Sequence, residues 1–304
     1  MIEVRDLTKT FGACRALDHI SCTIDNGCIY GLVGSNGAGK STLLRLLTGI
    51  YRPDAGSVRL NGREVCNDPM AKQRMIFVAD ELFFLPGANM HRMARLYAAE
   101  YPAFSYERLR ALAARFGLDM NANIQTFSKG MRRQAAILLS LCCHTDYILL
   151  DETFDGLDPV MRALVKRTLY EDIETRRATA VISSHSLREL EDTCDQLALM
   201  HRGGLVFESD VQNLKTTLFK VQVAFPEDFD RSVFDGVELL RFEKQGSVAR
   251  AIVRADRDEM RQRLAKRAPL LLELLPLSLE EVFVYELEAL GYAFGGDEEV
   301  EKEI

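Results

Sequence analysis

Short, uninterrupted apolar runs alternate with helix-like patterns through the first two-thirds of the chain. Four of these runs have the length of a buried strand and lie at residues 28–33, 75–79, 147–150 and 179–183. A strand that is apolar at every position fits a sheet covered on both faces, as parallel sheets are. The pattern therefore predicts an α/β core.

The apolar period changes twice along the chain. From Leu82 to Cys143, and most clearly from Met90 to Phe116, Ala, Leu and Arg recur at three- and four-residue spacing, which predicts an inserted helical subdomain. After Asp210 the pattern predicts three short strands, a helix and a further strand, at residues 220–225, 237–242, 248–253, 256–266 and 270–274. That order indicates a small α+β unit with a ferredoxin-like arrangement.

These changes divide the chain into three parts. We expect a main domain over residues 1–210, with the helical subdomain at about 82–143, and an α+β accessory domain over 211–290. An acidic tail follows at 291–304. It carries five acids and one lysine between Asp297 and Glu303, and we expect it to be disordered.

Composition narrows the class of protein. Hydrophobic residues make up 47% and charged residues 27% of the 304 residues, which excludes disorder as the main state. No apolar stretch approaches ~20 residues, and the charged N-terminus lacks the apolar region of a signal peptide, so we expect neither a membrane span nor secretion. The net charge of −7 argues against a nucleic-acid partner bound through bulk charge. The seven scattered cysteines fit reduced core residues of a cytosolic protein.

A phosphate-binding loop follows the first of the apolar runs. Residues 34–41 read Gly-Ser-Asn-Gly-Ala-Gly-Lys-Ser and fit the pattern G-x-x-x-x-G-K-[ST] between a strand and a helix. Such a loop turns backbone N–H groups toward a phosphate at a helix N-terminus, its lysine reaches the β- and γ-phosphates, and its hydroxyl binds Mg²⁺. The predicted nucleotide-binding residues here are Gly34, Ser35, Asn36, Gly37, Ala38, Gly39, Lys40, Ser41 and Thr42.

Two carboxylates end the third apolar run. Asp151 and Glu152 follow four apolar residues, at the edge of the sheet where ligands of open α/β folds bind. Asp151 fits a Mg²⁺ shell, and Glu152 fits the residue that orients or deprotonates the attacking water. Acids at strand ends are common, but together with the phosphate loop they predict an ATPase.

Between these motifs, residues 126–134 read Thr-Phe-Ser-Lys-Gly-Met-Arg-Arg-Gln ahead of an apolar helix. Here the chain resembles the ATP-binding subunits of ABC transporters, and most closely those of bacterial drug, peptide or polysaccharide exporters. The resemblance extends over about residues 2–210. It implies a P-loop NTPase core with an antiparallel β subdomain and the inserted helical subdomain, binding ATP with Mg²⁺.

Further site residues follow from the resemblance. Phe11, expected in a loop after the first strand, resembles the aromatic that stacks on adenine, and Asp158 lies in a segment, residues 155–159, that resembles the D-loop. His185 resembles the switch histidine, a catalytic residue that contacts the γ-phosphate and the attacking water as a polarising donor. Ser128 and Gly130 resemble the signature residues that bind the nucleotide of a second ATPase subunit in a head-to-tail dimer. Taken singly, Ser128 fits an ordinary helix N-cap, Phe11 a core residue and His185 a loop residue; the order of the motifs favours the nucleotide site.

Three positions depart from the family pattern. Asp80 stands where glutamine is usual; its carboxylate can bind Mg²⁺, although its shorter, charged side chain weakens the expected sensing role. Lys129 replaces a signature glycine, and Thr153 with Phe154 replaces the more usual residues after Glu152. None of these changes touches Lys40, Glu152 or His185, so we expect active chemistry.

The resemblance implies ATP hydrolysis that powers export through a separately encoded membrane permease, with the chain in the cytoplasm, peripheral on the inner face of the membrane. Residues 82–86, Leu-Phe-Phe-Leu-Pro, offer an apolar patch that fits a helix of the permease or packing within the subdomain. One alternative is a soluble ABC-type ATPase acting on ribosomes or DNA; another is a regulatory ATP-sensing module. A single ATPase core without heptads, and the intact Glu152, favour transport.

Overall fold

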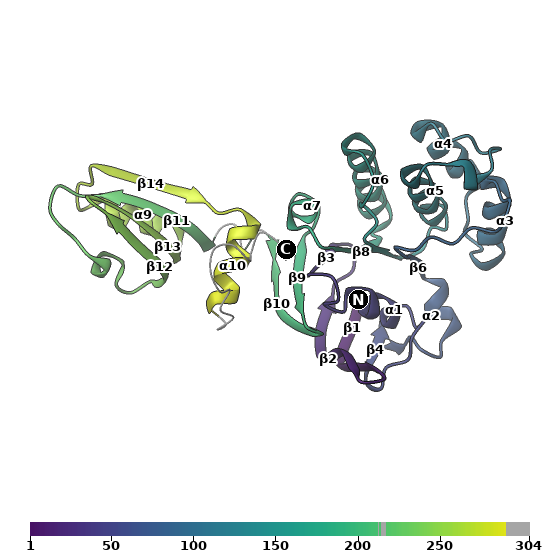
Figure 1. The fold of residues 1–304 in the computed structure, drawn as a ribbon, viewed down its shortest axis with the longest axis horizontal. Coiled ribbons are helices and arrows are strands. Elements are labelled where there is room, and N and C mark those ends of the chain that lie inside the picture. Colours follow the sequence, from purple (N-terminus) through teal and green to yellow (C-terminus); the bar gives the residue numbers. More distant parts are fainter. Residues whose placement is uncertain (212, 214–216, 290–304) are drawn as a thin grey trace. The chain divides into compact units, whose positions relative to one another are not determined.

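The computed structural model describes residues 1–211, 213 and 217–289 (Figure 1). The chain forms two compact units, the first from Met1 to Glu208 and the second starting at Ser209. The predicted acidic tail, residues 291–304, lies outside the described residues. In the described part of the chain the strands form three sheets, two in the first unit and one in the second.

The largest sheet contains all four predicted buried strands. Its strand order is β10-β9-β3-β8-β7-β6, and every pairing among β9, β3, β8, β7 and β6 is parallel. The strands are β3 Ile29–Val33, β6 Met75–Val78, β7 Tyr147–Asp151, β8 Thr179–Ser184, β9 Gln196–His201 and β10 Gly204–Asp210. Every residue of β3, β7 and β8 is buried, as their apolar runs predict. The predicted α/β core is confirmed.

An antiparallel sheet lies against the same core. Its strands are β1 Ile2–Phe11, β2 Cys14–Ile24, β4 Ala55–Leu60 and β5 Arg63–Glu64, in the order β2-β1-β4-β5. Helix α1, Lys40–Leu47, contacts both β2 and β7, and its leucines join the two sheets in one buried cluster. Helix α6, Pro159–Arg176, covers the central sheet on the side opposite α1, together with α7, Leu187–Glu191 (Figure 1). The antiparallel subdomain that the family resemblance implies is therefore present.

The inserted segment is helical but shorter than its periodicity suggests. It contains α3 Met90–Glu100, α4 Tyr106–Phe116, η1 Ile124–Thr126 and α5 Lys129–Leu141, whereas α2, Pro69–Gln73, precedes β6. The pattern from Met90 to Phe116 breaks at Tyr101, which is extended, because Pro102 follows it and cannot continue a helix. Residues 82–89 are not helical, so the helices of this subdomain begin at Met90.

The second unit has the order strand, 3-10 turn, strand, strand, helix, strand, helix. Its elements are β11 Leu218–Ala224, η2 Arg231–Phe234, β12 Glu238–Gln245, β13 Val248–Arg254, α9 Arg257–Ala265, β14 Leu271–Pro276 and α10 Leu279–Ala289. The sheet order is β12-β13-β11-β14. This is the element order of a ferredoxin-like unit in which η2 stands in place of the first helix.

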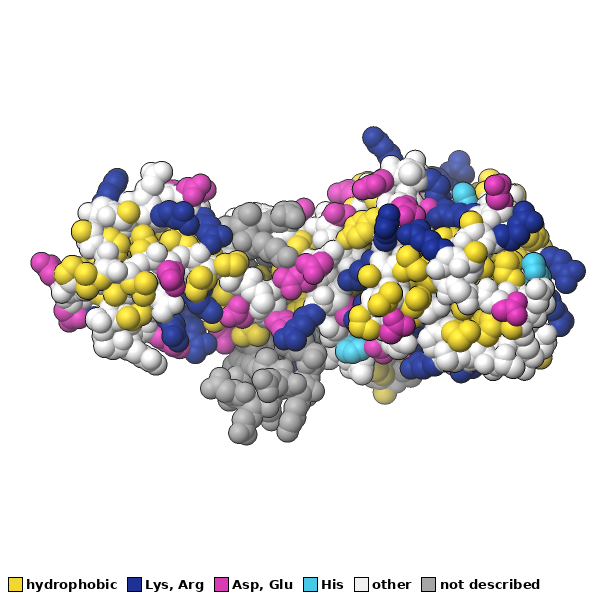
Figure 2. All heavy atoms as spheres, turned by 90° about the horizontal axis from the view of Figure 1, so that it is seen from above, with side chains coloured by type: hydrophobic (Ala, Val, Ile, Leu, Met, Phe, Trp, Pro, Cys, Tyr) yellow, Lys and Arg dark blue, Asp and Glu magenta, His cyan; other side chains and the backbone are white. Residues whose placement is uncertain are grey.

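The surface carries charges of both signs. On the face shown in Figure 2, basic and acidic side chains are interspersed with apolar ones. No helix in the described part of the chain is long and apolar enough to cross a membrane. Its seven cysteines are all free thiols, and burial raises the pKa of Cys142 to about 12.

Candidate active site

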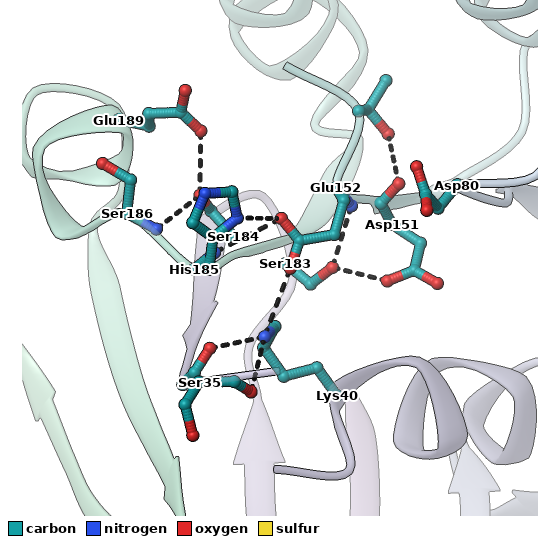
Figure 3. A network of polar contacts seen from close by, with 12 residues as sticks. Ser35, Lys40, Asp80, Asp151, Glu152, Ser183, Ser184, His185, Ser186 and Glu189 are labelled. Carbon is teal, nitrogen blue, oxygen red and sulfur yellow. Dashed lines mark hydrogen bonds and ion pairs between the residues drawn. The ribbon is translucent and has the colours of Figure 1, made fainter. Parts of the chain in front are cut away.

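The C-terminal ends of four neighbouring strands bring the predicted motifs to one edge of the central sheet. Val33 pairs with Ser184, and Asp151 pairs with Ser183, so β3, β8 and β7 end level with one another. The phosphate loop follows β3, Glu152 follows β7, His185 follows β8 and Asp80 lies two residues after β6. Figure 3 shows the polar network that results.

The phosphate loop is held tightly between β3 and α1. Gly39 has φ +104 and caps α1, a backbone conformation that a side chain would strain, and a Cβ there would approach the carbonyl oxygen of Ala16 at 2.6 Å. A Cβ at Gly34 would collide with the carbonyl oxygen of Met200. Asn36 and Gly37 are exposed at the tip of the loop, whereas Ala38 is buried. The loop therefore needs glycines for space as well as for conformation.

Lys40, the first residue of α1, is buried and turns back toward its own loop. Its Nζ donates to the carbonyl oxygens of Gly34 and, at 3.1 Å, of Ser35. It also forms an ion pair with Oε1 of Glu152 at 3.2 Å. Lys40 therefore links the phosphate loop to the carboxylate after β7 (Figure 3).

Asp151 is fully buried at the end of β7 and is the centre of a second set of contacts. Its Oδ1 accepts hydrogen bonds from the hydroxyls of Ser41, at 3.0 Å, and Ser183, at 2.7 Å. Its Oδ2 is buried and has no hydrogen-bond partner among the described residues. A buried carboxylate oxygen without a donor, beside a serine hydroxyl, is a donor set that suits Mg²⁺.

Glu152 occupies a backbone conformation that few side chains adopt. Its φ is +46, a strained value that recurs at active sites. Its N–H donates to Ser183 Oγ at 3.0 Å, and its Oε2 lies 2.9 Å from Nδ1 of His185. The hydrogen bond with Glu152 raises the pKa of the His185 imidazole above its ordinary value. Glu152 and His185 thus form a pair, and the expected contact of His185 with the γ-phosphate and the attacking water stays a prediction.

Asp80 contacts an arginine that the sequence analysis did not single out. Its Oδ1 accepts a hydrogen bond from Nη2 of Arg133 at 2.8 Å, and its side chain is 58% exposed. Arg133 lies in α5, is buried, and also donates from Nη1 to the carbonyl oxygen of Glu152 at 2.7 Å. The predicted roles of Asp80 in binding Mg²⁺ and nucleotide remain predictions.

The signature residues do not join the network around Lys40. Ser128 is exposed and caps α5, accepting a hydrogen bond from the N–H of Met131 at 3.2 Å. Gly130 packs on the D-loop, since a Cβ there would lie 3.0 Å from the carbonyl oxygen of Gly156. Asp158 caps α6 through the N–H groups of the two residues after Pro159. The side chains of Ser128 and Asp158 are therefore engaged as helix caps within one chain, and Gly130 is closely packed there.

Phe11 differs from its predicted place. It is the last residue of β1 rather than a loop residue, because the hairpin turn begins only at Gly12, which has φ +59. Its ring is 44% exposed and meets Tyr51 edge-on, with centroids 5.3 Å apart. An exposed ring face is compatible with base stacking, which stays a prediction.

Sequence reasoning missed two residues of this site, Ser183 and Arg133. Ser183 is a buried hydroxyl of β8 that directly follows three apolar residues, and its burial demands a polar partner. Arg133 lies four residues before Ile137, on the buried face of α5. A polar residue at a position that the apolar period assigns to the core was the available signal in both cases.

Comparison with known proteins gives a consistent result. The family described as ABC transporter matches residues 17–155. The chain is 28% identical to the ABC transporter ATP-binding protein YtrB of Bacillus subtilis, over 93% of this chain and 97% of that protein. It is 32% identical to the daunorubicin/doxorubicin resistance ATP-binding protein DrrA of Streptomyces peucetius, over 71% and 67%.

A relative of similar extent is the Nod factor export ATP-binding protein I of Rhizobium etli, 28% identical over 93% of this chain and 92% of that protein. Among solved structures, an ATP-binding subunit of an ABC transporter matches with a TM-score of 0.66 and 25% identity, over 71% of this chain and 92% of that one. The similarity therefore includes the arrangement of the first unit as well as its motifs.

Proposed function

The chain belongs to the ATP-binding proteins of ABC transporters and is an ATPase, and we propose that it powers export through a separate permease. The observation that carries the proposal is the convergence of Lys40, Ser41, Asp151, Glu152 and His185 at one edge of the parallel sheet. This is the edge at which open α/β folds bind their ligands. The names of two relatives, a drug-resistance protein and a Nod factor export protein, support the direction of transport.

Each side chain has a role in hydrolysis. Lys40 supplies positive charge and a donor to the β- and γ-phosphates, and backbone N–H groups of the phosphate loop surround them. Glu152 accepts the proton of the attacking water or orients it, and His185 holds the Glu152 carboxylate through Nδ1. Because phosphoryl transfer depends on positioning, these contacts matter more than any strong base would.

Ser41 and Asp151 would hold Mg²⁺. The buried, unpartnered Oδ2 of Asp151 and the adjacent hydroxyl of Ser41 fit oxygen ligation. The ion, when bound, neutralises negative charge on the phosphates. A second serine, Ser183, donates a hydrogen bond to Oδ1 of Asp151. This contact fixes the orientation of the carboxylate, so that Oδ2 points away from Ser183.

The signature residues serve the nucleotide of a second ATPase subunit. Ser128 is exposed at the N-terminus of α5, and its hydroxyl accepts from the N–H of Met131 within its own helix, which supports a ligand outside its own phosphate loop. ATP is then part of the interface, so nucleotide binding and dimerisation are linked. The second subunit is another copy of this chain or a related ATPase.

An apolar groove supports a membrane partner. It has a volume of about 320 Å³ and is lined by Phe77, Leu82, Phe83, Leu96 and Tyr97, among others, and Phe83 is 73% exposed. Two residues of the predicted patch at 82–86, Leu82 and Phe83, thus line a groove together with residues of β6 and α3. An amphipathic cytoplasmic helix of a permease fits such a groove and would hold the chain at the inner face of the membrane.

A mixing experiment tests the composite site. A chain with Glu152→Gln and a chain with Ser128→Arg are each expected to be inactive, but an equal mixture should regain about a quarter of the wild-type turnover per subunit. Half of the dimers are then mixed, and each mixed dimer has one intact site. The matched control mixes Glu152→Gln with Lys40→Ala, which damages both sites of every mixed dimer. Equal recovery in both mixtures, or none in the first, would exclude the composite arrangement.

A further inference from the structure

We infer that Arg133 is a positioning residue for Glu152 and that Asp80 is the counter-ion of Arg133. The inference rests on the proposed function, since it assigns Glu152 to hydrolysis. It gives Asp80 a task other than binding Mg²⁺. Both contacts of Arg133, with Glu152 and with Asp80, lie within a single chain.

Arg133 joins two segments that are far apart in the sequence. Its Nη1 donates to the carbonyl oxygen of Glu152 at 2.7 Å, and its Nη2 donates to Oδ1 of Asp80 at 2.8 Å. The two nitrogens of one planar guanidinium therefore fix the distance between the ends of β7 and β6. A rigid fork of this kind transmits position better than a flexible ammonium group would.

The burial of Arg133 makes Asp80 necessary. Arg133 is 2% exposed, and its Nε is buried without a hydrogen-bond partner among the described residues. A buried cation is tolerated when a carboxylate compensates it, and removal of one partner leaves an uncompensated charge. Asp80 is the acid that forms an ion pair with Arg133. The carboxylate of Asp80 is therefore paired with a residue of α5.

The backbone of Glu152 depends on side-chain contacts. At φ +46 it has left the regular strand pairing of β7, and its N–H is bound by Ser183. Its carbonyl oxygen accepts from Arg133 and, at 3.2 Å, from the N–H of Asp155. Loss of Arg133 would leave only the turn contact with Asp155 on that oxygen. The Glu152 side chain would then lose its fixed position relative to Lys40 and His185.

Residues next to both members of the Asp80–Arg133 ion pair line the apolar groove. Ala79 and Glu81, the neighbours of Asp80, line it, and so does Ala136, which lies one turn after Arg133 in α5. An occupant that moves the chain at residues 79–83 or shifts α5 therefore moves Asp80 relative to Arg133. The carbonyl of Glu152 follows through the other end of the guanidinium. This gives the groove a direct route to the catalytic carboxylate.

Steady-state ATP hydrolysis by the full chain tests the inference. Arg133→Met should lower kcat by about 10- to 100-fold, the effect of a small misplacement, while KM and the Kd for ATP stay within about twofold. Arg133→Lys, which keeps the charge in the core, should fold and still lose turnover. Asp80→Asn should lower kcat, and the double variant should turn over no more slowly than Arg133→Met alone, because both changes break one link.

Two further readouts separate positioning from structure. The double variant Asp80→Asn, Arg133→Met should be more resistant to urea than Asp80→Asn alone, since it no longer buries an unpaired charge, yet its kcat should not recover. The Mg²⁺ concentration that gives half-maximal activity should be unchanged in every variant. Arg108→Met is the matched control, because Arg108 forms a partly buried ion pair with Asp172 outside the site and its loss should affect stability and not kcat.

The outcomes are distinct. A kcat for Arg133→Met within twofold of the unaltered chain would overturn the positioning role. A raised Mg²⁺ requirement in Asp80→Asn but not in Arg133→Met would show that Asp80 binds the ion and would overturn its assignment as counter-ion. If the unaltered chain itself fails to hydrolyse ATP, the proposed function fails; if it hydrolyses ATP and Lys40→Ala does not, only the inference about Arg133 is in question.

Discussion

Ser183 offers the sharpest test of how the site is held together. Its side chain is buried, donates to Asp151 Oδ1 at 2.7 Å and accepts the N–H of Glu152 at 3.0 Å. Ser183→Ala removes one hydroxyl, which leaves the N–H of Glu152 without its acceptor and Oδ1 of Asp151 with Ser41 as its remaining donor. It creates no clash and little empty space, so the loss of these hydrogen bonds dominates the effect.

The magnitude follows from the two contacts. A hydrogen bond to a charged group contributes about 1.5–3 kcal/mol, and a buried N–H left without an acceptor costs about 1–3 kcal/mol. Partial relaxation of the Glu152 backbone reduces the sum, so we expect Ser183→Ala to lower the free energy of unfolding by about 2–4 kcal/mol. Turnover should fall as well, because both carboxylates at the end of β7 lose a fixed position.

Urea-induced unfolding of the full chain, followed by circular dichroism, measures the stability change as a shift in the midpoint at constant slope. Ser140→Ala is the matched control. Ser140 is equally buried, donates to the neutral carbonyl oxygen of Ala136 at 2.9 Å and has Tyr97 as a further, uncharged polar neighbour. It should cost about 1 kcal/mol or less and leave turnover unchanged. Equal losses of stability in the two variants, or full activity in Ser183→Ala, would refute the reasoning.

Three further predictions concern the catalytic pair and the phosphate loop. Glu152→Gln should leave ATP binding intact and lower turnover by about 10²–10⁴-fold, the range of a positioned base, and near-normal turnover would remove Glu152 from that role. Lys40→Ala should abolish detectable ATP binding in a fluorescence titration, because a charge and a donor at the phosphates are lost. Unchanged affinity would contradict the assignment of residues 34–41 as the phosphate loop. His185 has its pKa raised by the hydrogen bond with Glu152, so this contact stabilises the fold below the ordinary histidine value and its contribution is lost as pH rises through the raised value. An NMR titration of the imidazole should therefore give a lower pKa in Glu152→Gln than in the unaltered chain, and an identical pKa in both would argue against the contact.

Much of the fold could be predicted because burial on both faces leaves a simple signal. The runs that became β3 and β7 are apolar throughout, the run that became β8 is apolar at residues 180–182, and the structure buries every residue of these three strands. The phosphate loop could be located because its glycines meet a steric requirement that no other residue satisfies, as at Gly34 and Gly39. The end of the helix before Pro102 was equally readable in principle, since proline forbids its continuation.

The contacts inside the site were harder to predict because they join segments distant in the sequence. Ser183 and Arg133 lie 31 and 19 residues from Glu152, and nothing local indicates that each binds its backbone. The positive φ of Glu152 is set by those contacts. Because no glycine stands at this position, no local signal in the sequence predicts the conformation. Ser128 shows the opposite limit, since its local role as a cap is evident from the sequence, whereas its proposed role toward a second subunit depends on a partner.

Glu152 is held from two sides by different kinds of contact, and this division has a functional consequence. Its side chain meets Lys40 and His185, the groups proposed to face the phosphates, whereas its backbone meets Ser183 and Arg133. A residue in regular strand pairing would be fixed by its neighbours, but one with φ +46 takes its position from whichever side chains bind it. Nucleotide and partner can therefore act on the same carboxylate through separate contacts. Coupling between transport and hydrolysis then requires only a small displacement between α5 and the end of β6, without any change in the strands that form the core.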